Sequence, residues 1–306
     1  MSTCRKAIAL ITTLFFIMAI TVSIGVGLKY VNEASIEVNS ENFMIQTSVI
    51  IDDVLTMLKN SKELESIVGE KSQEALFTFL SQSSFIPFES SGLKINLEFS
   101  SARSRFNPNT LADGNSTQVD SPRVQALREY MSENMVDNIY VDILLDSMSG
   151  VKEDFSYNTE IFNEKPYLFR DYIASSKHLD ELNSFYMQAI QENSLKNINF
   201  ENLFYFSSDR STIIDLNYAT ADVWELMLGC TKERAKTIAV DRGYWNKIED
   251  IDLQEDEKEM LERFNPSYFE PYIDVRVEIL QNNKRANIRF EYNIKTKKGS
   301  NFNYDI

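Results

Sequence analysis

The residues of this chain that could carry chemistry are mainly carboxylates, and one acidic stretch has the spacing of a cation site. Asp142 and Asp146 lie four residues apart, so they share one face of the helix expected there. Gly150 permits a turn that would bring Glu153 and Asp154 back toward them. Because calcium is coordinated by several hard oxygen ligands, this arrangement is a candidate calcium site. The alternative is that these acids are solvated surface charge.

The other groups with catalytic potential are few. His178 is the single histidine, which excludes a site built from two histidines, and no Gly-x-Ser-x-Gly turn accompanies it. We interpret His178 as a structural residue on the surface at the start of a helix. Cys4 and Cys230 lie on opposite sides of the apolar N-terminal run, so no intrachain disulfide is expected. A hydrolase would rest on abundant carboxylates alone, and we expect no enzymatic activity.

Residues 214–239 have the pattern of two short helices joined by a tight turn. Thr220 can cap the first helix, Gly229 can end it, and Thr231 can cap the second. This resembles a helix-hairpin-helix unit, which is best known from proteins that bind the DNA backbone. Residues 214–242 carry four basic and five acidic side chains: Lys232, Arg234, Lys236, Arg242 and Asp215, Asp222, Glu225, Glu233, Asp241.

The charges around this unit decide whether we expect it to bind DNA or to pack within the protein. DNA binders place basic residues and a glycine-rich turn against phosphate, whereas this turn contains a single glycine and the whole chain has a net charge of −15. We therefore favour a packing role and expect no nucleic acid partner. A membrane-anchored DNA receptor of the competence type stays open as the alternative function.

The N-terminal region predicts how the rest of the chain is anchored. Residues 7–28 carry no charge over about 22 positions, which is long enough to cross a hydrocarbon core of about 30 Å. Arg5 and Lys6 precede this run, and acidic residues dominate soon after it. The positive-inside tendency places the N-terminus in the cytoplasm and the body outside it. A secretory signal peptide is disfavoured because its apolar region should be shorter.

Hydrophobic periodicity indicates an α+β body. Ile45, Val49, Leu55 and Leu58 have helical spacing, and a second helix is expected over residues 73–80. Alternation predicts a strand over residues 93–99 and a hairpin of strands over residues 272–280 and 286–294. The loop at residues 106–121 holds a glycosylation-type acceptor, Asn115, and the region from Ser121 to residue 264 is mostly helical. The economical arrangement is one antiparallel sheet packed on the N-terminal helix, with a helical insertion between its strands.

The order of these segments resembles the minor pseudopilin K of bacterial type II secretion systems over nearly the whole chain. The segments that carry the resemblance are, in order, Arg5-Lys6-Ala7 with Ile8-Ala9-Leu10-Ile11-Thr12, Lys94-Ile95-Asn96-Leu97, Phe106-Asn107-Pro108-Asn109-Thr110-Leu111, Leu145-Asp146, Glu153-Asp154 with Tyr157, Lys165-Pro166-Tyr167, His178-Leu179-Asp180-Glu181-Leu182, Ile214-Asp215-Leu216-Asn217 with Ala219-Thr220, and Ser267-Tyr268-Phe269.

The resemblance implies a division of the chain into a prepilin-type leader and four further parts. They are a leader at 1–7, a transmembrane helix at 8–28, the first half of a pilin-like domain at 29–111, a helical insertion at 112–266 whose second half, 207–266, is the helix-hairpin-helix or SAM-like unit, and a closing β-hairpin at 267–306. The body would lie in the periplasm, held to the inner membrane by a single pass.

The resemblance also implies a function. A K-type subunit is a non-enzymatic tip subunit of a pseudopilus that helps export folded proteins across the outer membrane, and its partners are other minor pseudopilins. A prepilin peptidase would cleave between Ala7 and Ile8. Thr12 is then the fifth mature residue, a position that is usually Glu in other pseudopilins and uncharged in the K subunit. Calcium binding is a further implication, with Asp146, Glu153 and Asp154 as the expected ligands.

Overall fold

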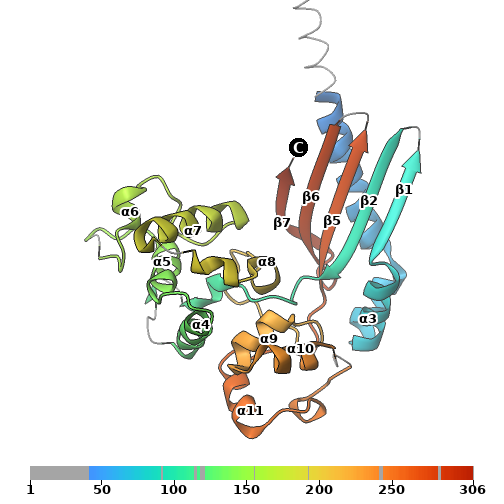
Figure 1. Ribbon diagram of the computed structural model, residues 1–306. Helices are drawn as coiled ribbons and strands as arrows, with labels where there is room; N and C mark the ends of the chain where they lie inside the picture. The colour runs from blue at the N-terminus through green and yellow to red at the C-terminus, as the bar shows by residue number, and fades with distance from the viewer. Residues whose placement is uncertain are drawn as a thin grey trace, which may run out of the picture.

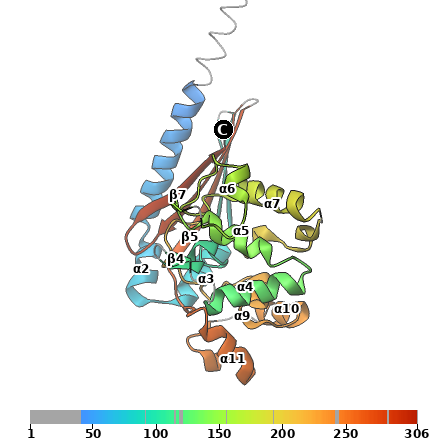
Figure 2. The same cartoon turned by 90° about the vertical axis from the view of Figure 1, so that its left-hand side faces the viewer.

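A helix packed on an antiparallel sheet forms one body of the molecule, and a group of short helices forms a second body beside it (Figures 1 and 2). The computed structural model describes residues 41–90, 92–113, 116–117, 121–154, 156–191, 193–240, 244–281 and 284–305. No helix within these ranges has the length and apolar content needed to cross a membrane. The predicted span at 8–28, the cleavage pair Ala7 and Ile8, Thr12 and Asn115 all lie outside the described residues.

Residues 41–60 form the helix that covers the sheet, as the periodicity predicts. Its buried face is made by Phe43, Thr47, Ile51, Val54 and Leu58, whose spacing of three or four residues keeps them on one side. Ile45 and Val49, whose spacing helped to predict this helix, are outside the buried face, with side chains 62% and 53% exposed. Two short helices follow, α2 (Lys62–Glu70) and α3 (Gln73–Gln82).

The sheet joins strands that are far apart in the sequence. Its order is β1 (Phe85–Ser90), β2 (Leu93–Ser101), β5 (Tyr272–Gln281), β6 (Lys284–Asn293) and β7 (Lys298–Asp305), and every neighbouring pair is antiparallel. The pairing of β2 with β5 runs in register from Leu93 opposite Gln281 to Ser101 opposite Ile273. The expected strand and hairpin therefore belong to one sheet.

Alternation along the strands separates the two faces of this sheet. Val275, Val277, Ile288 and Phe290 are buried toward the helical segment 41–60 and form one core with its apolar face. The intervening residues of β5 and β6 are charged or polar, and they point to the opposite face. That outer face looks toward the helical body.

Two strands of the sheet, β1 and β7, were not expected from the sequence. Pro87 lies within β1, where it is tolerated because β1 is an edge strand and needs partners on one side only. The other edge strand, β7, is polar and contains a register shift opposite Arg289 and Glu291. Asn301 adopts a φ of 54° next to this shift, a conformation that Asn tolerates better than most residues.

The helical body contains the elements between β2 and β5. They are η1 (Pro108–Leu111), the small pair β3 (Ala112–Asp113) and β4 (Ser116–Thr117), α4 (Pro122–Glu133), α5 (Ile139–Ser147), α6 (Ile161–Glu164), α7 (Ser176–Ile190), η2 (Ser194–Asn197), α8 (Phe200–Leu203), α9 (Ala221–Leu228), α10 (Lys232–Val240), η3 (Ile248–Asp250) and α11 (Glu255–Glu262). They enclose a separate core that includes Leu127, Tyr140, Tyr186 and Trp224. The mixed helix and antiparallel sheet fold is confirmed.

The caps expected in this body are present. Ser121 Oγ accepts a hydrogen bond from the Val124 amide at the start of α4, with Pro122 in the first turn. Thr220 caps α9 in the same way, and Gly229 ends α9 with a φ of 57°. Thr231 Oγ1 accepts from the amide of Arg234 in α10. The sequence therefore determines where α9 begins and ends and where α10 begins.

Candidate functional site

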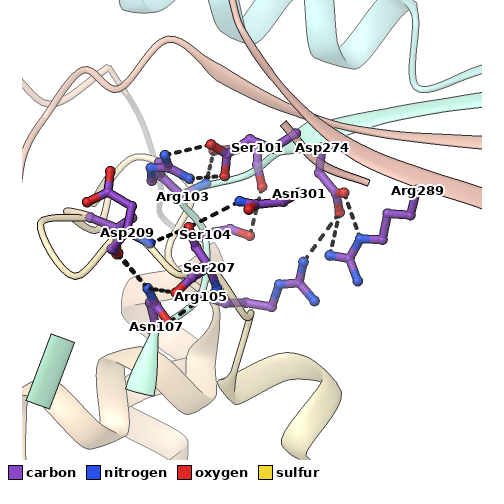
Figure 3. A network of polar contacts seen from close by, with 12 residues as sticks. Ser101, Arg103, Ser104, Arg105, Asn107, Ser207, Asp209, Asp274, Arg289 and Asn301 are labelled. Atoms are coloured by element: carbon purple, nitrogen blue, oxygen red, sulfur yellow. Dashed lines mark hydrogen bonds and ion pairs between the residues drawn. The ribbon is translucent and has the colours of Figure 1, made fainter. Parts of the chain in front are cut away.

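A polar network lies where the helical body meets the outer face of the sheet (Figure 3). Residues 101–109 leave the end of β2 and cross to the helical body, and Figure 3 shows Arg103, Arg105 and Asn107 projecting from this segment. Its backbone is bonded to both bodies: the amide of Ala102 donates to the Tyr272 carbonyl over 3.0 Å, and the amide of Phe106 donates to the Leu203 carbonyl over 2.9 Å. We call this region the junction.

Arg103 and Glu291 form a buried ion pair at the junction. The guanidinium donates from Nη1 and Nη2 to the two carboxylate oxygens over 2.5 and 3.0 Å, and the side chains are only 3% and 10% exposed. The Tyr272 ring lies 3.8 Å from the guanidinium carbon, which gives a cation–π contact. The hydrogen bond to Glu291 and the charges nearby raise the pKa of Arg103 despite its burial. The pair joins the first residues of the connecting segment to β6.

Asp274 of β5 is the centre of a second group of ion pairs. Arg289 donates to its carboxylate from Nε and Nη2 over 2.7 Å each, and Arg105 donates from Nη2 over 3.3 Å. Arg276 Nε lies 3.9 Å from the same carboxylate. Arg105 is buried and also donates to the Glu201 carbonyl over 3.1 Å, which links the helical body to the sheet.

Asn107 and Asn109 hold the connecting segment to the helical body through their side-chain amides. Asn107 Nδ2 donates to the carbonyls of Ser207 and Asp209 over 3.1 and 3.0 Å. Asn109 Nδ2 donates to the Ile173 and Ser207 carbonyls, and its Oδ1 accepts from the Ile173 amide over 2.7 Å. Both side chains are buried, so these bonds satisfy backbone groups that water cannot reach.

Strand β7 completes the junction. Asn301, at the register shift, donates from its side-chain amide to the Ser207 hydroxyl over 3.1 Å (Figure 3). A cleft of about 900 Å³ opens beside it, lined on the sheet side by Asp274, Arg276, Arg289 and residues 301–304, and on the helical side by residues of α7, α8 and the segment that follows α8. The chemistry of the junction is that of recognition: fixed guanidinium, amide and carboxylate groups around an open cleft.

The residues expected to bind calcium are not brought together. Asp146 is buried, and its carboxylate accepts hydrogen bonds from the Asn158 amide and side chain and from the Thr159 amide and hydroxyl, over 2.7–3.1 Å. Glu153 and Asp154 are exposed on the following turn.

This arrangement does not fit a calcium site made by these three residues, since donors already occupy both oxygens of Asp146. Within the described ranges, no group of three or more His, Cys, Asp or Glu side chains is placed to hold a metal ion. Burial raises the pKa of Asp146, which a bound cation would oppose. Calcium binding stays a prediction from the resemblance.

His178 is in the first turn of α7, as expected, but the expectation of a surface position is wrong. The ring is buried, its Nδ1 accepts from the Ala174 amide over 3.3 Å, and it packs edge-on near Phe169 at 6.3 Å between centroids. Burial lowers the pKa of His178, so the neutral ring is favoured at neutral pH. These contacts support the structural role assigned from the sequence.

Two basic residues of the α9–α10 pair, Lys232 and Arg234, contact groups of the protein itself. Lys232 donates to the Asn134 side chain over 2.9 Å. Arg234 donates to both oxygens of Glu257 over 3.0 and 2.9 Å. A guanidinium held in this way is not available to phosphate without breaking its ion pair. The geometry therefore agrees with the packing role, while DNA binding stays an alternative prediction.

The residues of the junction were not identified from the sequence. Asp274, Arg289 and Glu291 occupy the polar positions of alternating strands, which normally face solvent. Asn107 lies in a tract rich in Asn, Asp, Gly and Ser, which is typical of a loop. One signal in the sequence that could have identified the junction is the repetition of arginine at alternate positions, Arg103 and Arg105, directly after a strand.

Comparison with known proteins supports the fold. One chain of a solved structure, the GspK-GspI-GspJ complex of the type 2 secretion system of enterotoxigenic Escherichia coli, superposes with a TM-score of 0.56 and 15% sequence identity. The match covers 87% of this chain and 96% of that chain. No protein-family model matches this sequence, and no curated protein matches it. The mixed helix and antiparallel sheet fold expected from the resemblance to minor pseudopilin K is therefore confirmed, while the transmembrane helix expected at 8–28 lies outside the described residues.

Proposed function

We propose that this protein is a minor pseudopilin of the K type, a tip subunit of a type II secretion pseudopilus that helps export folded proteins across the outer membrane. The observation that carries the proposal is the shared fold, which extends over most of both chains and includes the helical body between the strands of the sheet. A small pilin-like domain alone would match only the helix and sheet.

The N-terminal sequence supports the same function independently. Arg5 and Lys6 precede a small residue, Ala7, and an apolar run that starts at Ile8, which suits a leader removed on the cytoplasmic side of a helix that is retained. Thr12 places no charge at the fifth mature position. A tip subunit has no subunit above it, so an uncharged residue there is consistent with this position in the assembly. The body would then lie in the periplasm.

The helical segment 41–60 offers a surface for partner subunits. Met44, Ile45, Val49 and Met57 are all more than 40% exposed, although each is apolar. Ile45 and Val49 lie on the side of the helix opposite its buried face, whereas Met44 and Met57 lie on the two flanks of that face. Apolar side chains that remain exposed along one helix favour packing against the helices of other minor pseudopilins.

The test is reconstitution with candidate smaller minor pseudopilins from the same organism. The full chain is co-expressed with them, purified in a non-ionic detergent, and the complex is measured by size-exclusion chromatography with light scattering, with and without calcium. Ile45→Glu with Val49→Glu should abolish the complex, because it places charge on the apolar surface. Gln46→Glu is the matched control, since it adds a charge at a neighbouring exposed position of the same helix.

A stoichiometric complex that the double variant loses and the control retains would support the proposal. If no complex forms in either condition, the tip-subunit proposal fails and the DNA-receptor alternative is tested by duplex DNA binding at low salt, where phosphate contacts are strongest. If the complex forms only with calcium, calcium binding by the assembly is supported, and its ligands are then sought by substitution of single carboxylates.

A further inference from the structure

Three arginines converge on a single carboxylate at the edge of the cleft. Arg289 and Arg105 donate to Asp274, and Arg276 lies within ion-pair distance of it, at 3.9 Å. We call these four residues the arginine cluster. It carries three positive charges and one negative charge, so two positive charges are not balanced within it. This surplus occurs in a chain whose net charge is −15.

The cluster has an electrostatic cost in the free protein. Arg276 and Arg289 are directly opposite each other on β5 and β6, and like charges in that position destabilise a sheet. Burial, followed by repulsion from Arg289, lowers the pKa of Arg105 to about 10. An additional anionic group in the cleft would offset both effects.

The acidic residues nearby do not supply that group. Glu291 is held by Arg103 through two hydrogen bonds. Glu98 is opposite Arg276 on β2, and Asp180 and Glu201 line the far wall with Lys177. Among the ion pairs of the described residues, none joins Glu98, Asp180 or Glu201 to the arginine cluster. Glu98 therefore offsets part of the charge of Arg276 without forming an ion pair, and the positive surplus that remains is on the sheet side of the cleft.

The cluster is also accessible. The side chains of Arg276 and Arg289 are 52% and 39% exposed and retain N–H groups beyond those given to Asp274. The cleft beside them, at about 900 Å³, is far larger than a single small anion requires, and Tyr172, Phe206 and Phe302 give it apolar walls. Strand β7 borders the cleft and is an edge strand, so one side of its backbone has no strand partner in the described sheet.

We propose that this cleft binds an extended acidic segment of a partner protein, with carboxylates of the segment on Arg276 and Arg289 and its main chain along β7. A guanidinium binds a carboxylate through two parallel hydrogen bonds, which gives this contact specificity as well as attraction. An edge strand binds an extended peptide through its backbone groups. The inference goes beyond the proposed function, because the partner need not be a pseudopilin.

The test uses the full chain in a non-ionic detergent and a fluorescent octapeptide of alternating Val and Glu, with binding measured by fluorescence anisotropy at low salt. A peptide of alternating Val and Gln has the same length and β-propensity without charge. Arg276→Gln removes one guanidinium that has only a long contact to Asp274. Arg263→Gln is the matched control, since Arg263 is a partly exposed arginine that lies 3.7 Å from Glu129 in the helical body, outside the cleft lining.

Saturable binding of the Glu peptide, weakened at least about five-fold by Arg276→Gln and unchanged by Arg263→Gln, would support the proposal; a five-fold effect is the scale expected for one partly exposed charge-assisted contact. The Gln peptide should bind more weakly by a larger factor. Equal binding of both peptides, an equal loss in both variants, or no binding would overturn it. Displacement of the peptide by inorganic phosphate at equal concentration would also overturn it, because the site would then recognise a small anion.

Discussion

The Arg103 guanidinium donates two hydrogen bonds to the Glu291 carboxylate, across 188 positions of sequence, at a place where the two side chains are almost fully buried. Arg103 belongs to the segment that leaves β2, and Glu291 belongs to β6. Their pairing determines where the helical body begins relative to the sheet. Because both charges are buried, each depends on the other for its stability.

We predict that Arg103→Met destabilises the protein by about 3–5 kcal/mol, since it leaves the Glu291 carboxylate buried without its partner. The double variant with Glu291→Leu should recover much of that loss, because no buried charge remains. The free energies of unfolding are measured by urea denaturation. A double variant that is less stable than the single variant would contradict this account.

Substitution of Asn109 should destabilise the protein about as much as substitution of Arg103, for a different reason. Asn109→Leu keeps the volume but leaves the Ile173 amide and carbonyl without their side-chain partner, whereas the Ser207 carbonyl keeps its hydrogen bond from Asn107. Each unsatisfied buried group costs about 1–3 kcal/mol, so we expect the loss of several kcal/mol in thermal or urea unfolding. The control is Asn202→Leu, at an exposed position, which should stay within about 0.5 kcal/mol of the parent protein.

Asp215 should make stability depend on pH. Its carboxylate accepts from the amides of Asn217 and Glu270, and burial raises its pKa to about 7. The folded protein therefore holds this proton at pH values where the unfolded chain has lost it. The stability gained in this way is fully present below about pH 4 and is lost as the pH rises toward 7.

Comparison with Asp215→Asn isolates this contribution, because the other carboxylates with raised pKa values, such as Glu225 and Glu270, are present in both proteins. The difference in unfolding free energy, parent minus variant, should fall by up to about 1.4 kcal/mol per pH unit between pH 4 and 7 and then level off. A difference that rises with pH would show that the hydrogen bonds outweigh burial at this site.

Leader removal is the prediction that tests the N-terminal interpretation. In cells with an active prepilin peptidase, intact-mass spectrometry should find a mature chain that begins at Ile8. Ala7→Gly should be processed equally well, whereas Ala7→Glu should block cleavage because the small residue before the cut is replaced by a large charged one. A purified chain that retains residues 1–7 would show that this processing does not occur.

Local patterns in the sequence determined most of the secondary structure. Period-two alternation predicted β2, β5 and β6, and helical spacing predicted the segment 41–60 and α4. Caps at Ser121, Thr220 and Gly229 determined where helices begin and end, since each satisfies backbone groups within a few residues. The edge strands β1 and β7 were missed because they bury little and carry Pro or polar residues.

The tertiary structure alone decided which polar residues are buried and hydrogen-bonded at the junction. Asp274 and Glu291 have the pattern of solvent-facing strand residues, and they are buried because a helical body inserted between β2 and β5 folds back over the outer face. Asn107 and Asn109 lie in a segment with the composition of a loop. They are buried because their side-chain amides donate hydrogen bonds to distant carbonyls within residues 173–209. Whether a polar group is buried depends on elements that are far away in the sequence, and a local sequence pattern does not show which distant elements will cover it.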